Sequence, residues 1–220
     1  MRSVCDLLFV ALLAVGCDKP ITATLPEPAG ATQAEPVVAT QAEPAAASTC
    51  DARQAELSAQ ADLLAKPWSI EQHLGKNFSD GKVSWLMKKD PYETYVVNSG
   101  ARNFGRCDDS GCYLFAAPTA VIENAVVKSR TGATHDPAVL GQALGLPAKN
   151  FEGPLRMMTL DLDAAGSCVR LPMESDPGVW KCATAEDKDC FKFGGYTSGN
   201  VPEVMVIDAP VAQAVVTEIP

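Results

Sequence analysis

The stretch best suited to chemistry lies near the end of the chain, from Phe193 to Asp208. Its glycines allow a ligand to approach the backbone closely, and Thr197, Ser198 and Asn200 offer hydrogen bonds. The same loop delivers Glu203 to the start of an apolar, β-branched run. A carboxylate at a strand end can orient a ribose hydroxyl or stabilise positive charge on a sugar carbon, as glycosyl transfer requires. The alternative is a hairpin loop with a solvated glutamate.

Other candidates for a site are few. His73 sits beside Leu74 in a helical pattern and His135 directly precedes a helix start, so packing and loop roles are favoured for them. With only two histidines and no Cys-x-x-Cys pair, a zinc site is disfavoured and no metal is expected. The sequence has no serine-hydrolase elbow, Walker phosphate loop, dinucleotide-binding glycine motif or zinc-protease His-Glu-x-x-His.

The helices that would position these residues lie mainly in the first half of the domain. A first helix, capped by Thr49 or Asp51, should run to Lys66, where Pro67 stops it. Another begins at Asp136-Pro137 and ends at a glycine suited to a left-handed cap. The predicted helices span residues 51–66, 69–74, 118–128 and 136–144, and the apolar stripe of the first comprises Ala55, Ala59, Leu63 and Leu64.

Strand patterns dominate the second half. The predicted strands span residues 83–87, 92–97, 113–116, 155–162, 168–171, 179–182, 203–208 and 214–219. Helices followed by strands predict an α+β fold with a mostly antiparallel sheet, rather than an alternating parallel-sheet protein.

Cysteine usage predicts that disulfides staple this domain. Apart from Cys5 and Cys17 near the N-terminus, six cysteines remain, an even number in a chain with an export signal. Six cysteines allow 15 pairings. Spacing favours three of them: Cys107–Cys112, Cys182–Cys190 and Cys50–Cys168.

The N-terminus has the pattern of an export signal, because Arg2 precedes a short apolar run over residues 7–15. Its Ala-Val-Gly-Cys ending resembles the lipobox of bacterial lipoproteins, in which the peptide is cut before the cysteine and the new terminus is acylated. The resemblance implies that residues 1–16 are a signal peptide and that Cys17 is the lipidated first residue. It implies a membrane-anchored lipoprotein of the cell envelope, facing the periplasm or the cell surface. A plain secretory signal or an unprocessed anchor helix is the alternative.

Residues 17–49 predict a disordered tether between this anchor and a globular domain of residues 50–220. The segment is rich in Pro and Ala, contains no aromatic residue and repeats Ala-Thr-Gln-Ala-Glu-Pro. The net charge of the chain is -9, which argues against nucleic acid as a partner.

Several motifs of the domain resemble the ADP-ribosyltransferase-like domains of bacterial polymorphic toxins. Residues 194–203 read Gly-Gly-x-Thr-Ser-Gly-x-x-Pro-Glu and look like their last motif. Residues 136–147, which end in Leu-Gly-Leu-Pro, are similar to a helix-plus-loop segment of that family. Residues 95–97 and 113–115 look like its first strand and the aromatic-rich strand that follows. The resemblance covers roughly residues 83–220 and implies the same fold.

Family members split NAD and transfer ADP-ribose or hydrolyse it. The resemblance implies that Glu203 is catalytic and that Tyr196, Thr197 and Ser198 line the nicotinamide side. The chain departs from the family at residues 95–97, where valines replace the Arg or His that holds NAD. The loop that follows supplies two candidates for phosphate binding, Arg102 and Arg106.

Two functions are therefore expected. The first is a tethered binding module, a degenerate ADP-ribosyltransferase fold that needs no cofactor. It is held at the membrane by its N-terminal lipid and grips a protein or envelope ligand. The alternative is an active ADP-ribosyltransferase or NAD glycohydrolase that uses Glu203, with NAD as its substrate.

Overall fold

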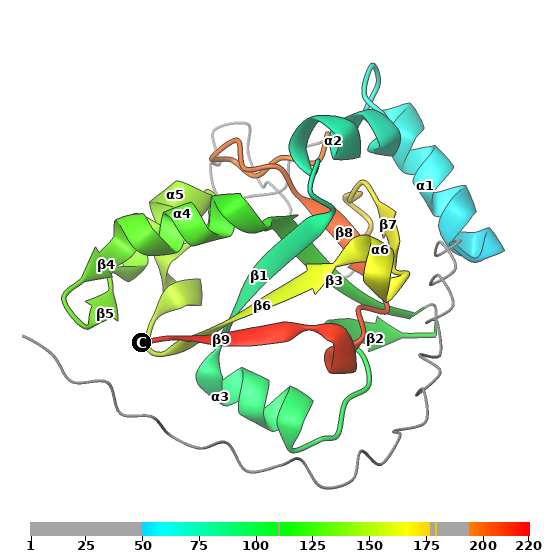
Figure 1. The fold of residues 1–220 in the computed structure, drawn as a ribbon. Coiled ribbons are helices and arrows are strands. Elements are labelled where there is room, and N and C mark those ends of the chain that lie inside the picture. The colour runs from blue at the N-terminus through cyan, green and yellow to red at the C-terminus, as the bar shows by residue number, and fades with distance from the viewer. Residues whose placement is uncertain (1–49, 110, 177–178, 180–193) are drawn as a thin grey trace, which may run out of the picture. The chain divides into compact units, whose positions relative to one another are not determined.

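The computed structural model describes residues 50–109, 111–176, 179 and 194–220. The signal, Cys17, the tether and the expected Cys182–Cys190 bridge lie outside the described residues, as does most of the strand expected at 179–182. The described residues confirm an α+β fold with a mostly antiparallel sheet (Figure 1). No helix among them is long and apolar enough to cross a membrane.

Helices and strands alternate irregularly along the described chain. The helices are α1 (Ala52–Leu64), α2 (Ile70–Asn77), α3 (Lys89–Tyr92), the π-helical η1 (Glu93–Val97), α4 (Thr119–Ser129), α5 (Pro137–Leu144), the 3-10 turns η2 (Ala148–Phe151) and η3 (Val211–Gln213), and α6 (Leu162–Ala165). The strands are β1 (Lys82–Lys88), β2 (Arg106–Asp108), β3 (Gly111–Pro118), β4 (Arg130–Thr131), β5 (Thr134–His135), β6 (Leu155–Asp161), β7 (Cys168–Arg170), β8 (Val204–Ile207) and β9 (Val215–Ile219).

The main sheet has the strand order β7-β8-β3-β1-β6-β9, and β2 pairs with β3 outside this path. All of these pairs are antiparallel. The central strand β1 pairs with β6 along its whole length, from Lys82 opposite Asp161 to Lys88 opposite Leu155. With β3 it pairs only where Ser84 lies opposite Ala117 and at the adjoining position. The two strands therefore diverge beyond this point.

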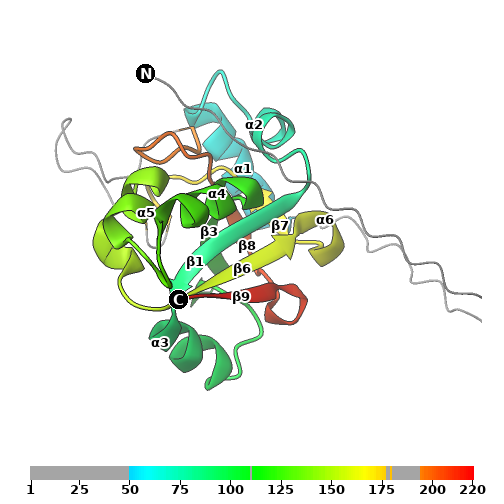
Figure 2. The same cartoon turned by 60° about the vertical axis from the view of Figure 1, so that its left-hand side comes forward.

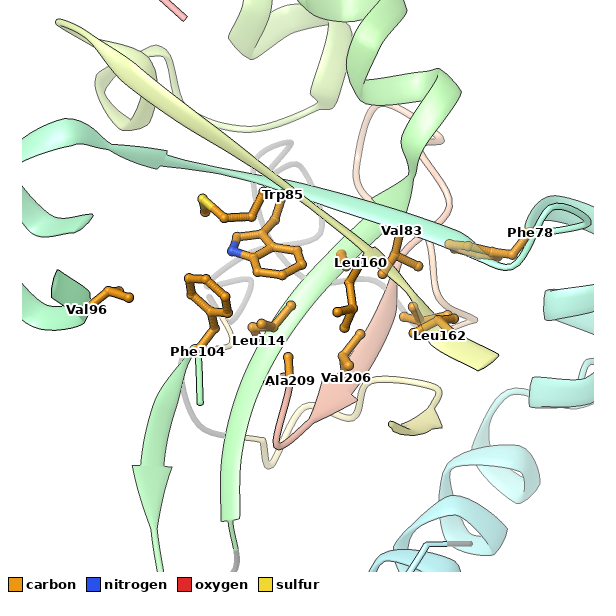
Figure 3. Close-up of a cluster of buried hydrophobic side chains, with 13 residues drawn as sticks. Phe78, Val83, Trp85, Val96, Phe104, Leu114, Leu160, Leu162, Val206 and Ala209 are labelled. Carbon is orange, nitrogen blue, oxygen red and sulfur yellow. The ribbon is translucent and has the colours of Figure 1, made fainter. Parts of the chain in front are cut away.

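Side chains alternate between the two faces of the sheet. On β1, Val83 and Trp85 point to one face, and Ser84 and Leu86 point to the other. Figure 3 shows the cluster that packs the first face, in which Trp85 and Phe104 meet edge to face with ring centroids 5.0 Å apart. The second face is covered by α4 and α5, which lie side by side (Figures 1 and 2).

The helix ends follow the sequence signals. Asp51 caps α1 by accepting a hydrogen bond from the Gln54 N–H at 2.7 Å. Asp136 caps α5 in the same way, and Gly145 ends it in the left-handed conformation at φ 66°. These caps satisfy backbone groups that a helix end leaves unpaired, so α1 begins, and α5 begins and ends, where predicted. The end of α1 falls two residues before the predicted Lys66, and α2 runs on to Asn77, three residues past the predicted Leu74.

The strand predicted at residues 92–97 is wrong, because this segment forms the end of α3 and the π-helical η1. Pro91 falls in the first turn of α3, where a missing N–H costs nothing. Glu93 accepts ion pairs from Lys89 at 3.7 Å and from Arg156 at 3.8 Å. The first is a local pair within the helical segment and the second joins it to β6, and both favour the helical form over the strand propensity of Tyr95-Val96-Val97. The comparison of residues 95–97 with the first strand of ADP-ribosyltransferase-like domains is therefore wrong as well.

The apolar stripe predicted for α1 is also wrong. Its four residues are exposed, and Leu63 and Leu64 are exposed at 62% and 58%. The helix instead buries Gln54, which accepts a hydrogen bond at 3.2 Å from the guanidinium of the fully buried Arg170. It also buries Ala61, which packs with Leu171 and Met173. A polar partner and a small apolar cluster thus set the rotation of α1 together.

Two of the three expected disulfides are present. Cys50–Cys168 joins the start of α1 to β7, and Cys107–Cys112 links directly opposed residues of β2 and β3. The first bridge fixes a long-range feature of the fold, the position of α1 against the sheet, and the second fixes the local β2–β3 hairpin.

Candidate functional site

A pocket of about 240 Å³ opens on the sheet face that α4 and α5 cover. It lies where β1 and β3 diverge, so that side chains of both strands reach it. The loop of residues 194–203, orange in Figure 1, borders it from the other side. The lining residues are Ser84, Trp85, Leu86, Phe115, Ala117, Ile122, Leu144, Gly145, Leu146, Pro147, Asn150, Phe151, Val179, Tyr196, Thr197, Val201 and Glu203.

Strand register brings Glu203 to this pocket. Val204 at the start of β8 pairs with Ala116 of β3, so continuing the register by one residue sets Glu203 opposite Ala117. Ala117 in turn pairs with Ser84 of β1. Residues directly opposite one another share a face of the sheet, so the three form a row across it. The structure therefore brings the predicted catalytic residue into a pocket, as the loop motif suggested.

The Glu203 carboxyl group has no side-chain partner among the described residues. Within the described part of the chain, no hydrogen bond or ion pair reaches it, and only its backbone is tied: its N–H donates to the Gly195 carbonyl at 2.7 Å. Burial without a compensating partner raises the pKa of Glu203 to about 7. A carboxyl group with this pKa exchanges protons near neutral pH and is suited to general acid–base chemistry or to ion pairing with a ligand.

His73 of α2 positions Glu203 through its backbone. The Asn77 amide nitrogen lies 3.2 Å from His73 Nδ1, and His73 Nε2 lies 3.1 Å from the Glu203 carbonyl oxygen. Since the amide donates to Nδ1, the imidazole carries its hydrogen on Nε2 and donates it to the carbonyl. Burial lowers the pKa of His73, which keeps this neutral form. His73 therefore has the packing role that the sequence favoured, and this packing holds the backbone of Glu203 at the pocket.

Two of the three other loop residues expected at the site line the pocket. Tyr196 packs its ring edge against His73 at 5.1 Å, and its hydroxyl accepts a hydrogen bond from Asn77 at 3.1 Å. Thr197 is buried, and its hydroxyl accepts from the Val201 N–H at 3.2 Å. Ser198 is not a lining residue. Its hydroxyl donates to the carbonyl of Gly145 at 2.9 Å and fastens the loop to the end of α5.

This fastening explains the glycines of two sequence motifs. A side chain at Gly145 would collide with the backbone of Gly199, and a Cβ at Gly199 would lie 2.8 Å from the Cα of Gly145. The loop and the helix end therefore touch backbone to backbone, which only glycine permits. The Leu-Gly-Leu-Pro and Gly-Gly-x-Thr-Ser-Gly segments meet here and form one wall of the pocket.

The two arginines expected to bind phosphate are not brought to the site. Both are exposed, and Arg106 lies in β2, opposite Tyr113 near the start of β3. The pocket lies toward the other end of that strand, at Phe115 and Ala117. Neither Arg102 nor Arg106 lines it, so the structure separates them from Glu203.

Sequence reasoning missed the contribution of β1. Ser84, fully buried, hydrogen-bonds Thr119 at 3.0 Å and Thr159 at 2.8 Å, and Trp85 and Leu86 complete that side of the pocket. The strand itself was predicted, but its pairing with β3 is long-range and leaves no local signal. The one local hint is a serine inside the apolar run of residues 83–87.

Within the described residues, no group of three or more His, Cys, Asp or Glu side chains is arranged to hold a metal ion. Comparison of the chain with protein-family models, with curated proteins and with solved structures finds no match.

Proposed function

We propose that this chain is a tethered binding module of the bacterial cell envelope. Acyl chains on Cys17 hold it at a membrane, residues 18–49 let it reach outward, and the domain binds an extracytoplasmic partner. The pocket beside Glu203 takes a group of that partner.

The observation that carries this proposal is the combination of an apolar pocket with one unpaired carboxyl group. Ligand sites are typically concave and mostly apolar, with a few polar groups that fix orientation. A cavity of about 240 Å³ is large beside the space that one water molecule needs, on the order of 10–15 Å³. It suits one side chain or one small ring rather than a whole dinucleotide.

The position of the arginines favours binding over NAD chemistry. A dinucleotide carries two phosphates, but Arg106 lies toward the other end of β3 and Arg102 does not line the pocket. The domain then represents an ADP-ribosyltransferase-like fold whose enzyme activity is lost. The Cys50–Cys168 and Cys107–Cys112 bridges fit a protein that works in an oxidising compartment outside the cytoplasm.

Ligand titration of the oxidised full chain tests the binding role. A library of small organic fragments is screened by NMR, with the amide signals of Ala117 and Thr197 as reporters of the pocket. We expect hits that shift these signals and that, followed at Thr197, lose affinity in Ala117→Phe, which fills the pocket. Ala212→Phe, at an exposed position of η3, is the matched control. If no fragment shifts the pocket signals, the binding role is wrong.

Labelling with a radioactive fatty acid tests whether Cys17 is acylated. We expect the wild-type chain to incorporate label, Cys17→Ser to lose it and Cys5→Ser to retain it, because Cys5 belongs to the signal. An unlabelled wild-type chain would contradict the lipoprotein proposal.

The raised pKa of Glu203 supports a second candidate, the NAD-dependent enzyme, because a carboxyl group with a pKa near 7 can act as a general acid or base. The test is NAD hydrolysis by the purified chain, with Glu203→Ala beside it. Turnover that Glu203→Ala abolishes would favour the enzyme. No turnover by the wild type, and no change of its melting temperature with NAD, removes it.

A further inference from the structure

We infer that the group held in the pocket is an apolar moiety bearing a primary ammonium, with its apolar body against the α4–α5 side and its ammonium on the Glu203 carboxylate. This inference rests on the binding role proposed above and names the chemistry of the partner.

The walls select the apolar body. Leu86 and Phe115 of the sheet, Ile122 of α4, and Leu144 and Phe151 from the α5–η2 segment face the cavity. A hydrocarbon group that leaves water for such a surface gains free energy in proportion to its buried area. A strongly hydrated ligand has no such gain.

The charge selects the ammonium. Among the described lining residues, Glu203 and Tyr196 are the only titratable ones, and β1, β3, α4, α5 and η2 contribute none. From α2, His73 reaches the backbone of Glu203 in its neutral form, and Lys76 lies on the same helix, where its charge helps lower the pKa of His73. An anion would therefore meet the charge of Glu203, whereas a cation is attracted to it.

The unpaired state of the carboxyl group adds to this attraction. Glu203 has already lost much of its hydration, and the described residues give its side chain no partner in return. A ligand ammonium supplies the missing ion pair in surroundings where charge–charge attraction is stronger than in water. A neutral ligand of the same shape leaves the carboxylate unpaired and binds less tightly.

Binding of the ammonium then depends on pH. With the pKa of Glu203 raised to about 7, about one tenth of the group is ionised at pH 6 and about nine tenths at pH 8. Because apparent affinity scales with the competent fraction, the ammonium ligand should bind about tenfold more tightly at pH 8 than at pH 6.

The experiment compares benzylamine with benzyl alcohol, which has the same ring and no charge. Each is titrated into the oxidised full chain at pH 6 and pH 8, and the amide signals of Ala117 and Thr197 report the pocket. Glu203→Gln removes the charge at nearly constant shape. Glu123→Gln, at an exposed position on α4 next to the lining residue Ile122, removes a charge outside the pocket.

We expect benzylamine to bind more tightly than benzyl alcohol at pH 8 and to lose about tenfold in affinity at pH 6. We expect both effects to vanish in Glu203→Gln and to persist in Glu123→Gln. If the two ligands bind equally, or if the affinity for benzylamine ignores pH, the inference is overturned and the binding role stands. If neither ligand shifts the pocket signals and the fragment screen is also empty, the binding role fails too. The wild-type comparison decides the matter even if a variant does not fold.

Discussion

Two of the ionisable side chains that this domain shields from water differ in how the fold pairs them. Arg170 is fully buried and fully engaged: its guanidinium donates to Asp176 with two nitrogens, to Gln54 and to the carbonyl of Leu171. Glu203, at the pocket, has no side-chain partner among the described residues, and burial raises its pKa to about 7. The fold thus supplies every partner of Arg170, whereas the Glu203 carboxyl group remains available to a ligand.

The difference separates architecture from binding. The Arg170 cluster ties α1 and the chain after β7 to the sheet, since Asp176 also accepts from the Met173 N–H at 2.6 Å. Carboxyl groups shielded from water are usually paired within the fold. Glu203 instead lines a pocket without a side-chain partner among the described residues, and we take this as the mark of the binding site.

The largest expected loss of stability from a single substitution comes from removing Arg170, the fully paired group. Arg170→Ala leaves the Asp176 carboxylate buried without its partner, so the free energy of unfolding should fall by about 3–5 kcal/mol. Denaturant unfolding measures it, with Arg106→Ala, at an exposed position, expected within about 0.5 kcal/mol of wild type. A loss below about 1 kcal/mol for Arg170→Ala would show that the cluster does not hold the fold.

The two disulfides should differ in how much they stabilise the fold. Cys50–Cys168 closes a separation of 118 residues beside the Arg170 cluster, whereas Cys107–Cys112 closes one of 5. Because the entropy removed from the unfolded chain grows with loop length, replacing both cysteines by serine should cost about 5 kcal/mol for the first bridge and about 2 kcal/mol for the second. Equal losses in thermal unfolding would contradict this ordering.

Local sequence patterns predicted most helices, most strands and the loop that carries Glu203. The caps at Asp51 and Asp136 and the alternation of β6 are properties of adjacent residues, so they could be read directly. The rotation of α1 could not, because it depends on Gln54 meeting Arg170 across 116 positions of the sequence. The pocket could not be predicted from adjacent residues either, because its walls depend on the register between β1 and β3.

Removing the unpaired charge should stabilise the protein. The pKa of Glu203 is raised in the folded state, so ionisation of this group destabilises the folded protein. The free energy of unfolding is therefore unaffected by it below about pH 4.5 and falls as the pH rises through about 7. Since the side chain is only partly buried, we expect Glu203→Gln to gain about 1–3 kcal/mol at pH 8 and almost nothing at pH 4.5. A loss of stability at pH 8 would mean that the carboxylate has a partner.

His73 should give a smaller effect of opposite sign. Its pKa is lowered by burial, so it supports stability above pH 6.5 and that support is lost as the pH falls through the folded-state pKa. His73→Gln keeps a donor for the Glu203 carbonyl and should flatten this acid-side loss. His73→Leu removes the donor and should cost about 1–2 kcal/mol more than the glutamine variant at pH 7. Equal stabilities would show that the hydrogen bond does not position the loop.

The contrast between the two regions depends on the state of one carboxyl group. Selective ¹³C labelling of glutamate allows the side-chain carbon of Glu203 to be followed by NMR from pH 4 to pH 9, with Glu203→Gln assigning the signal. We predict a titration midpoint near pH 7, which moves lower when benzylamine is added. A midpoint near 4.5, unchanged by the amine, would contradict it.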